Sequence, residues 1–158
     1  YGATATAQWR SGPLEINGSV TLSRATGRDI RSSQFAFDAE ELDYIRGKWV
    51  RTDHDQLITA TAGAVWRAWE GGRVSATAYF GNGLRRGFAN SEKGDPYATV
   101  NLGVAHRFTT LGGEWEARLD VLNIADARVQ LRDGSGIGVG APQFLARRAA
   151  YAGLTRFF

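Results

Sequence analysis

The 158-residue sequence contains no cysteine, so disulfides and thiolate metal sites are excluded. It has no apolar run near the roughly 20 residues that a membrane helix needs, which excludes a helical membrane protein. A membrane β-barrel is not excluded, because its signal is alternation rather than a run. Proline is scarce (3 residues) and glycine abundant (20), which favours strands and glycine-rich loops.

Net charge, motifs and length limit which classes of protein this sequence can belong to. The net charge is +3 and both signs are scattered along the chain, so we expect no nucleic-acid partner. No G-x-S-x-G nucleophile elbow occurs, and the sequence predicts neither an enzyme nor a cofactor. The length suits one domain. Because the chain starts at Tyr1 without a visible signal peptide, we expect a processed product, an expressed fragment or a piece of something longer.

A period-2 alternation of apolar and polar residues is the main structural signal. It predicts strands of about 9–13 residues, longer than the 5–6 typical of soluble sheets and close to the 9–11 or so that cross a bilayer. The seven predicted strands are Ala3–Arg10, Leu14–Ser23, Ile58–Arg67, Arg73–Phe80, Ala98–Phe108, Glu114–Val121 and about Arg148–Phe158.

The connections between these strands are alternately short and long. Short turns at Ser11–Pro13, Glu70–Gly72 and Thr109–Gly113 alternate with long segments at Ala25–Asp55, Leu84–Pro96 and Ile124–Arg147. An all-β, antiparallel up-and-down meander would place all short turns at one end, as in outer-membrane barrels. Aromatic residues gather at that end, as a girdle at a membrane interface requires: Trp9, Trp66, Trp69, Phe108, Trp115, Phe157 and Phe158.

The odd strand number is inconsistent with a complete bacterial barrel, which has an even number of at least eight. An open sheet in lipid would leave edge groups unsatisfied at several kcal/mol each. We therefore expect either strands before Tyr1 or an extra strand hidden in residues 25–55.

Several stretches resemble the C-terminal barrel of TonB-dependent receptors, the bacterial outer-membrane transporters. They are YIRGKWVRTDHDQ (44–56), FGNGLRRGFAN (80–90) followed by PYATVNLGV (96–104), RLDVLNIAD (118–126), and the closing segments 134–144 and 147–158. Nearly the whole chain is covered in the expected order. Two departures are the Ala149-Ala150 pair and Arg156, where an apolar or aromatic residue is common.

This resemblance implies that residues 1–158 are the last seven strands of a 22-stranded barrel in the outer membrane of a Gram-negative bacterium. The plug and the earlier strands have no counterpart here, so the TonB complex would be contacted through that missing plug. The receptor would take up a scarce ligand such as a siderophore, cobalamin or a carbohydrate. The terminal residues Tyr151, Gly153 and Phe158 resemble the signal that the barrel-assembly machinery reads.

Four arginines, at predicted extracellular strand ends, are weak candidates for contacts with lipopolysaccharide phosphates or an anionic ligand: Arg85, Arg86, Arg147 and Arg148. An acidic loop could contact a cation, although simple solvation is favoured: Asp38, Glu40, Glu41 and Asp43. Asp53-His54-Asp55 could be a metal or acid–base cluster, but adjacent strand residues alternate sides, which favours a solvated strand entry. His106 suits an interface rather than a ligand role.

The stretch Gly136–Ala141 matches the dinucleotide fingerprint G-x-G-x-x-[G/A]. No helix follows it, so we predict that Gly134–Gly140 is a non-helical loop outside the membrane, with glycines that tolerate positive φ. Two alternatives to the transporter remain open: a small structural or adhesive outer-membrane barrel, and a soluble lipocalin-like barrel that binds a lipophile.

Overall fold

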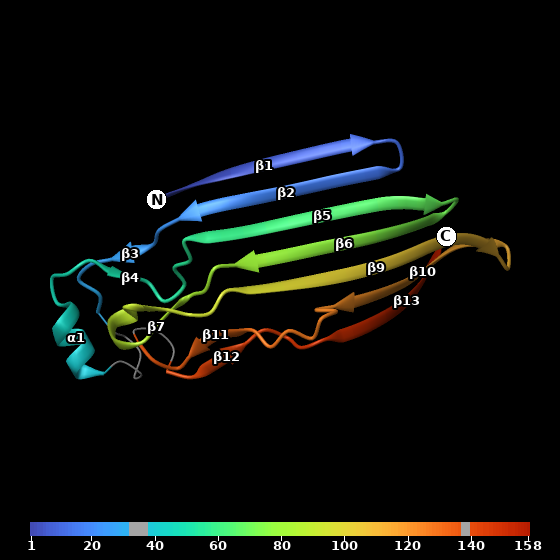
Figure 1. The fold of residues 1–158 in the computed structure, drawn as a ribbon. Coiled ribbons are helices and arrows are strands. Elements are labelled where there is room, and N and C mark those ends of the chain that lie inside the picture. Colours follow the sequence, from blue (N-terminus) through green and yellow to red (C-terminus); the bar gives the residue numbers. More distant parts are fainter. Residues whose placement is uncertain (32–37, 137–139) are drawn as a thin grey trace.

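The architecture is a single seven-stranded antiparallel sheet with elaborate connections at one end (Figure 1). The computed structural model describes residues 1–31, 38–136 and 140–158. The sheet order is β1-β2-β5-β6-β9-β10-β13, so each strand pairs with the next long strand in the chain. The strands are β1 Gly2–Ser11, β2 Leu14–Ser23, β5 Ile58–Trp69, β6 Gly72–Gly81, β9 Tyr97–Thr110, β10 Gly113–Leu122 and β13 Ala149–Phe157. The predicted all-β meander of seven long strands is confirmed.

Short turns lie at one end of the sheet and long connections at the other, as the sequence predicts (Figure 1). The β1–β2 turn is only Gly12-Pro13, and Gly12 adopts a φ of +52°. Gly71 adopts a φ of +71° in the β5–β6 turn. This left-handed conformation is one that glycine adopts without a steric penalty, which lets two long strands reverse in two residues.

The sheet is not closed into a barrel. β1 pairs with β2 along all ten of its residues, and β13 pairs with β10, but within the described residues neither strand has a partner on its other side. The structure thus shows an open sheet with two free edges, and the assignment of this sheet to a larger barrel stays a prediction.

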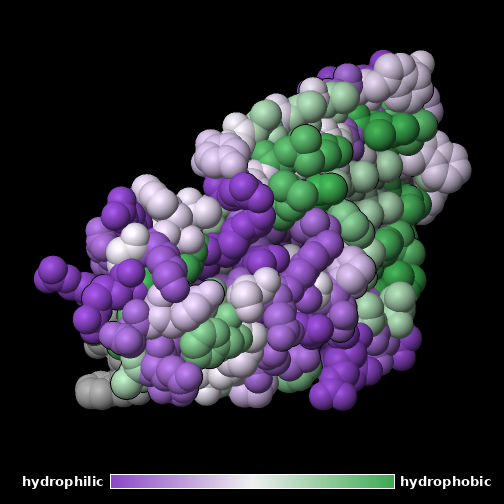
Figure 2. Space-filling model, turned by 60° about the vertical axis from the view of Figure 1, so that its left-hand side comes forward, coloured by the Kyte–Doolittle hydropathy of each residue, from purple (hydrophilic) through white to green (hydrophobic). Residues whose placement is uncertain are grey.

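One face of the sheet is apolar, and we call it the apolar face. Side chains of directly paired residues project on the same side of a sheet, so the strand registers place one apolar row beside the next. Many of these residues are exposed, including Val20 at 48%, Leu119 at 50% and Leu154 at 63%. Figure 2 shows hydrophobic residues gathered over the strands and hydrophilic ones over the loops. Among the described residues, no second layer covers this face.

The opposite face, which we call the polar face, carries hydroxyl and charged side chains bonded to one another. The Thr4 and Thr21 hydroxyls are 2.9 Å apart, as neighbours on β1 and β2. Glu116 on β10 accepts two hydrogen bonds from Arg73, at 2.9 and 3.0 Å, and one from Arg107 at 3.1 Å. These cross-strand contacts hold β6, β9 and β10 together on the polar face.

The aromatic residues at the short-turn end do not all share one face, which corrects the prediction of a uniform girdle. Trp115 is on the apolar face, where the Arg156 guanidinium lies 5.5 Å from its ring centroid. Phe157 is opposite Glu114 on the polar face, under the guanidinium of Arg107 at 4.9 Å. Because strand residues alternate sides, neighbours in sequence such as Arg156 and Phe157 must face opposite ways.

Helices are short in this protein. The described residues include no helix that is both long and apolar enough to span a membrane. The described residues form two helices, α1 (Ala39–Ile45) and the 3₁₀ turn η1 (Phe88–Asn90), both in the long connections.

Candidate ligand-binding surface at the long-loop end

The three long connections fold against one another beyond the end of the sheet (Figure 1). The first holds β3 (Thr26–Gly27), α1 and β4 (Val50–Arg51); the second holds β7 (Arg85–Arg86), η1 and β8 (Glu92–Lys93); the third holds β11 (Gln130–Asp133) and β12 (Pro142–Phe144). The first and second share a small buried cluster of Ile45, Val50 and Ala89. This cluster gives the connections a fixed shape, which a binding surface requires.

The helix α1 replaces the acidic loop predicted for residues 38–43. The Asp38 carboxylate accepts the Glu40 backbone N–H at 3.2 Å as the N-cap, and Leu42 and Ile45 face the buried cluster. Glu41 is only 6% exposed, and its Oε1 accepts the backbone N–H of Ala89 at 2.7 Å. Glu41 therefore joins two connections.

The described part of residues 25–55 adds no strand to the seven-stranded sheet. It forms the two-residue strands β3 and β4, which pair only with each other, and helix α1. The prediction of a hidden barrel strand there finds no support in the described part of this segment. The sequence of α1 explains why this part is helical: its apolar residues are spaced three apart, as in a helix, and not two apart, as in a strand.

The Asp53-His54-Asp55 stretch is part of two ion-pair clusters. Asp55 is 2% exposed, accepts the Ala25 backbone N–H at 2.6 Å and pairs with Arg51. Asp53 instead pairs with Arg132 on β11, whose guanidinium also contacts the His54 ring. Asp53 and His54 therefore share Arg132 as a partner, whereas Asp55 belongs to the separate pair with Arg51.

No group of three or more potential metal ligands occurs in the part of the chain that the structure describes. His106, the other histidine, lies at the short-turn end and accepts a hydrogen bond from the Trp69 indole at 3.1 Å.

The four candidate arginines form two separate pairs. Arg147 makes a two-pronged contact with Asp126, at 2.8 and 2.5 Å, and the Arg148 backbone N–H donates to the same carboxylate at 2.9 Å. The Arg147 side chain, more than the Arg148 amide, holds the pKa of Asp126 well below its usual range. This pair is thus engaged within its own connection.

Arg85 and Arg86 lie together on β7. Arg85 donates to the carbonyls of Asn90, at 3.0 Å, and Ser91, at 2.7 Å. Arg86 is 3.9 Å from Glu92 and 4.0 Å from Asp95, at the outer limit of an ion pair. Of these four guanidinium groups, only that of Arg147 has a carboxylate at hydrogen-bond distance within the described residues.

The glycine-rich stretch lies in the third connection, between β11 and β12. Gly134 and Gly136 have φ values of +90° and +74°, and neither they nor Gly140 are helical. Residues 137–139 lie outside the described residues. Ser135 donates to the Asp133 carboxylate from both its hydroxyl and its amide, and the hydroxyl bond is the larger cause of a lowered Asp133 pKa. The predicted non-helical loop with positive φ is confirmed for the described positions.

The three residues of the predicted assembly signal lie on or next to β13. Tyr151 and Gly153 pair with Asp120 and Arg118 on the polar face, and Tyr151 is 59% exposed. Phe158 follows the strand, with the Arg156 guanidinium 4.8 Å from its ring centroid. Their role in assembly stays a prediction.

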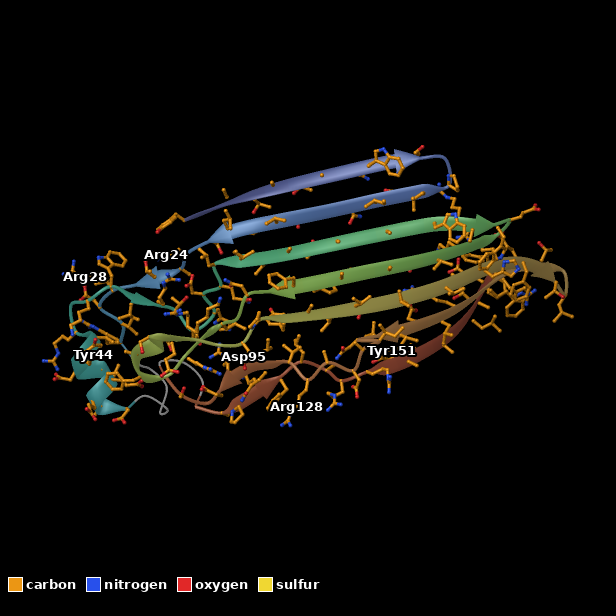
Figure 3. All side chains as sticks on the ribbon, in the orientation of Figure 1. Arg24, Arg28, Tyr44, Asp95, Arg128 and Tyr151 are labelled. Carbon is orange, nitrogen blue, oxygen red and sulfur yellow. The ribbon has the colours of Figure 1, made fainter. Side chains whose placement is uncertain are left out.

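A cavity of about 420 Å³ lies between the β7–β8 hairpin and the β11–β12 hairpin. Its wall includes two of the predicted arginines and several residues that sequence reasoning missed. Figure 3 marks Arg128 beside the β11–β12 hairpin and Asp95 between this hairpin and the sheet. The residues used below are Arg85, Arg86, Asp95, Tyr97, Arg128, Arg132 and Phe144.

Comparison with known proteins adds no relative. No protein-family model, no curated protein and no solved structure matches this chain.

Proposed function

We propose that the chain is the C-terminal section of the β-barrel of a TonB-dependent receptor, a ligand transporter in the outer membrane of a Gram-negative bacterium. The observation that carries the proposal is the uncovered apolar face on a single sheet whose other face is polar. A water-soluble sheet buries its apolar face against a second layer. In a membrane, lipid tails cover the apolar face, so no second protein layer is needed.

The strand dimensions suit this surrounding. A ten-residue strand such as β2 is about 34 Å long at about 3.4 Å per residue. Tilted by about 45°, it spans about 24 Å, close to the apolar band of about 25 Å in outer-membrane barrels. The polar face would then line the barrel interior, with its hydroxyls and ion pairs in contact with water or a plug.

The free edges favour a section of a larger barrel over a self-contained one. An edge strand of ten residues such as β1 directs about half of its N–H and C=O groups away from its one partner. In lipid each unsatisfied group costs several kcal/mol, so further strands must pair with β1 and β13. The alternatives of a small adhesive barrel and a lipocalin-like barrel both require β1 to pair with β13, which it does not do here.

The family and the transport role are supported by the resemblance of residues 44–56, 80–104, 118–126 and 134–158 to TonB-dependent receptors. In that role the long connections face the outside and the short turns face the periplasm. Partners would be outer-membrane lipid, lipopolysaccharide, the barrel-assembly machinery, and the TonB complex through a plug.

Fractionation of cells that express the natural gene tests the proposal. We expect the polypeptide in the outer membrane and resistant to alkaline extraction. We also expect unheated and boiled samples to migrate differently in denaturing gels, because a folded barrel resists the detergent until it is heated. We also expect peptides of residues 1–158 within a chain long enough for a plug and further strands. A detergent-independent soluble monomer would contradict the proposal.

A further inference from the structure

The cavity between the β7–β8 and β11–β12 hairpins is unusually rich in arginine. Arg85 and Arg86 come from β7, Arg128 from the segment before β11, and Arg132 from β11 itself. Two acids, Asp95 and Asp133, also line it. The wall is therefore more cationic than anionic. A cation of the wall is available to a ligand only if no carboxylate of the protein already neutralises it.

Within the described residues, only one of the four guanidinium groups has a close carboxylate partner. Arg132 is 8% exposed and pairs with Asp53. Arg85 donates to two backbone carbonyls and has no carboxylate within ion-pair distance among the described residues. Its pKa is lowered, first by burial and then by the neighbouring positive charge of Arg51. Arg85 is thus half-buried, and its guanidinium is held by the carbonyls of Asn90 and Ser91.

The other two arginines are nearer to solvent. Arg86 has acids only at 3.9 and 4.0 Å, and these two side chains, Glu92 and Asp95, are 67% and 91% exposed. Arg128 lies over the ring of Phe144, with its guanidinium carbon 4.9 Å from the centroid, and has no acidic partner in the described part of the chain. Stacking leaves the edge of a guanidinium free to donate hydrogen bonds.

We propose that this cavity binds the carboxylate or phosphate group of an organic anion, with Arg86 and Arg128 as its direct contacts. The planar guanidinium fork matches the oxygens of both groups. The volume of about 420 Å³ falls in the range of small-molecule sites and exceeds what one inorganic ion fills. Phe144 and Tyr97 supply an aromatic wall for the rest of the ligand.

The carboxylate of Asp95 should oppose anion binding in this cavity. It lies on the cavity wall, is 91% exposed and competes with a ligand for Arg86. Removing its charge should therefore strengthen anion binding, while removing either arginine should weaken it. A purely structural role for these residues would not produce opposite signs.

The inference rests on the proposed function only in taking the long-loop end as the ligand-facing side. Two sources could present the chemistry there: a free organic anion, or the phosphate groups of lipopolysaccharide. Protein purified in detergent from cells that express the natural gene is titrated with citrate at low salt, and separately with vesicles of phosphatidylcholine with or without lipopolysaccharide.

We expect Arg128→Ala and Arg86→Ala each to weaken binding about tenfold, and Asp95→Asn to strengthen it severalfold. Arg46→Ala is the matched control, because Arg46 pairs with Asp43 on α1 and does not line the cavity. Citrate binding with this pattern identifies a free organic anion; the same pattern with lipopolysaccharide vesicles alone identifies the lipid. Either supports the proposal.

Binding of both probes that is equal in the two arginine variants and in Arg46→Ala, or absent from the unchanged protein, overturns it. Each variant is also checked for outer-membrane location and for the heat-dependent gel shift. Correct location without anion binding refutes the cavity site and leaves the transporter proposal standing. Wrong location of the unchanged protein refutes the transporter proposal, and the citrate titration still tests the cavity.

Discussion

The apolar face makes a quantitative prediction at Val20, near the middle of β2. Val20 is 48% exposed and has Ala5 and Ala60 as its cross-strand neighbours. In water, a surface substitution at such a position changes the free energy of unfolding by no more than about 0.5 kcal/mol. In lipid, an arginine near the bilayer midplane costs about 2–4 kcal/mol. The two surroundings therefore predict clearly different results for Val20→Arg.

The adjacent residue provides the matched control. Thr21 lies on the polar face, where its hydroxyl is 2.9 Å from that of Thr4. Thr21→Arg adds the same side chain one residue away, towards water, and loses at most one exposed hydroxyl contact worth about 1 kcal/mol. Both variants are unfolded with urea from lipid vesicles, and tryptophan fluorescence is followed.

We expect Val20→Arg to lower the free energy of unfolding by about 2–4 kcal/mol, and Thr21→Arg by about 1 kcal/mol or less. The larger value reduces the ratio of folded to unfolded protein by a factor of roughly thirty to nine hundred. The reasoning is refuted if the two variants lose the same stability, or if Thr21→Arg loses more.

Three further predictions concern the long-loop end. Gly83 has a φ of +98° and faces a backbone carbonyl of the neighbouring chain segment, so Gly83→Ala should destabilise the β7–β8 hairpin by about 1–3 kcal/mol, seen as faster protease cleavage there. Glu41→Ala leaves the buried Ala89 amide without its acceptor, so hydrogen exchange at that amide should accelerate. Arg147 lowers the pKa of Asp126 in the folded protein. The contact between Asp126 and Arg147 therefore adds to the free energy of unfolding at neutral pH, and this addition is lost as pH falls through the folded-state pKa. Asp126→Asn should remove this acid sensitivity, measured as the pH dependence of protection in residues 123–148; an unchanged pH dependence would contradict it.

The strands of this fold were predictable because alternation is a local signal. The segment Leu14–Ser23 repeats it without interruption, and the structure forms β2 over those same residues. Short turns such as Gly12-Pro13 were equally predictable, since glycine and proline mark reversals in sequence. Alternation also predicts that Phe157 faces away from Leu154 and Arg156. The girdle prediction missed this because it grouped the aromatic residues by their position along the strands and not by the face that they occupy.

The long-loop end was less predictable because its contacts join residues far apart in sequence. Arg85 and Arg128 line one cavity, and no local pattern connects them. Helix α1 did carry a local signal, an Asp38 cap followed by acids in the first turn and by Leu42 and Ile45. Seven residues are too few for periodicity to stand out from a polar loop.

Spin labelling along β2 tests the central claim, that one face of the sheet meets lipid and the other water. Because residues 1–158 contain no cysteine, single cysteines can be placed at each of residues 16–22 without a background signal from this section. In lipid vesicles we predict that labels at Ile16, Gly18, Val20 and Leu22 are relaxed mainly by oxygen, which concentrates in the bilayer. Labels at Asn17, Ser19 and Thr21 should be relaxed mainly by a water-soluble nickel chelate. Equal access of the chelate to all seven positions would contradict the account.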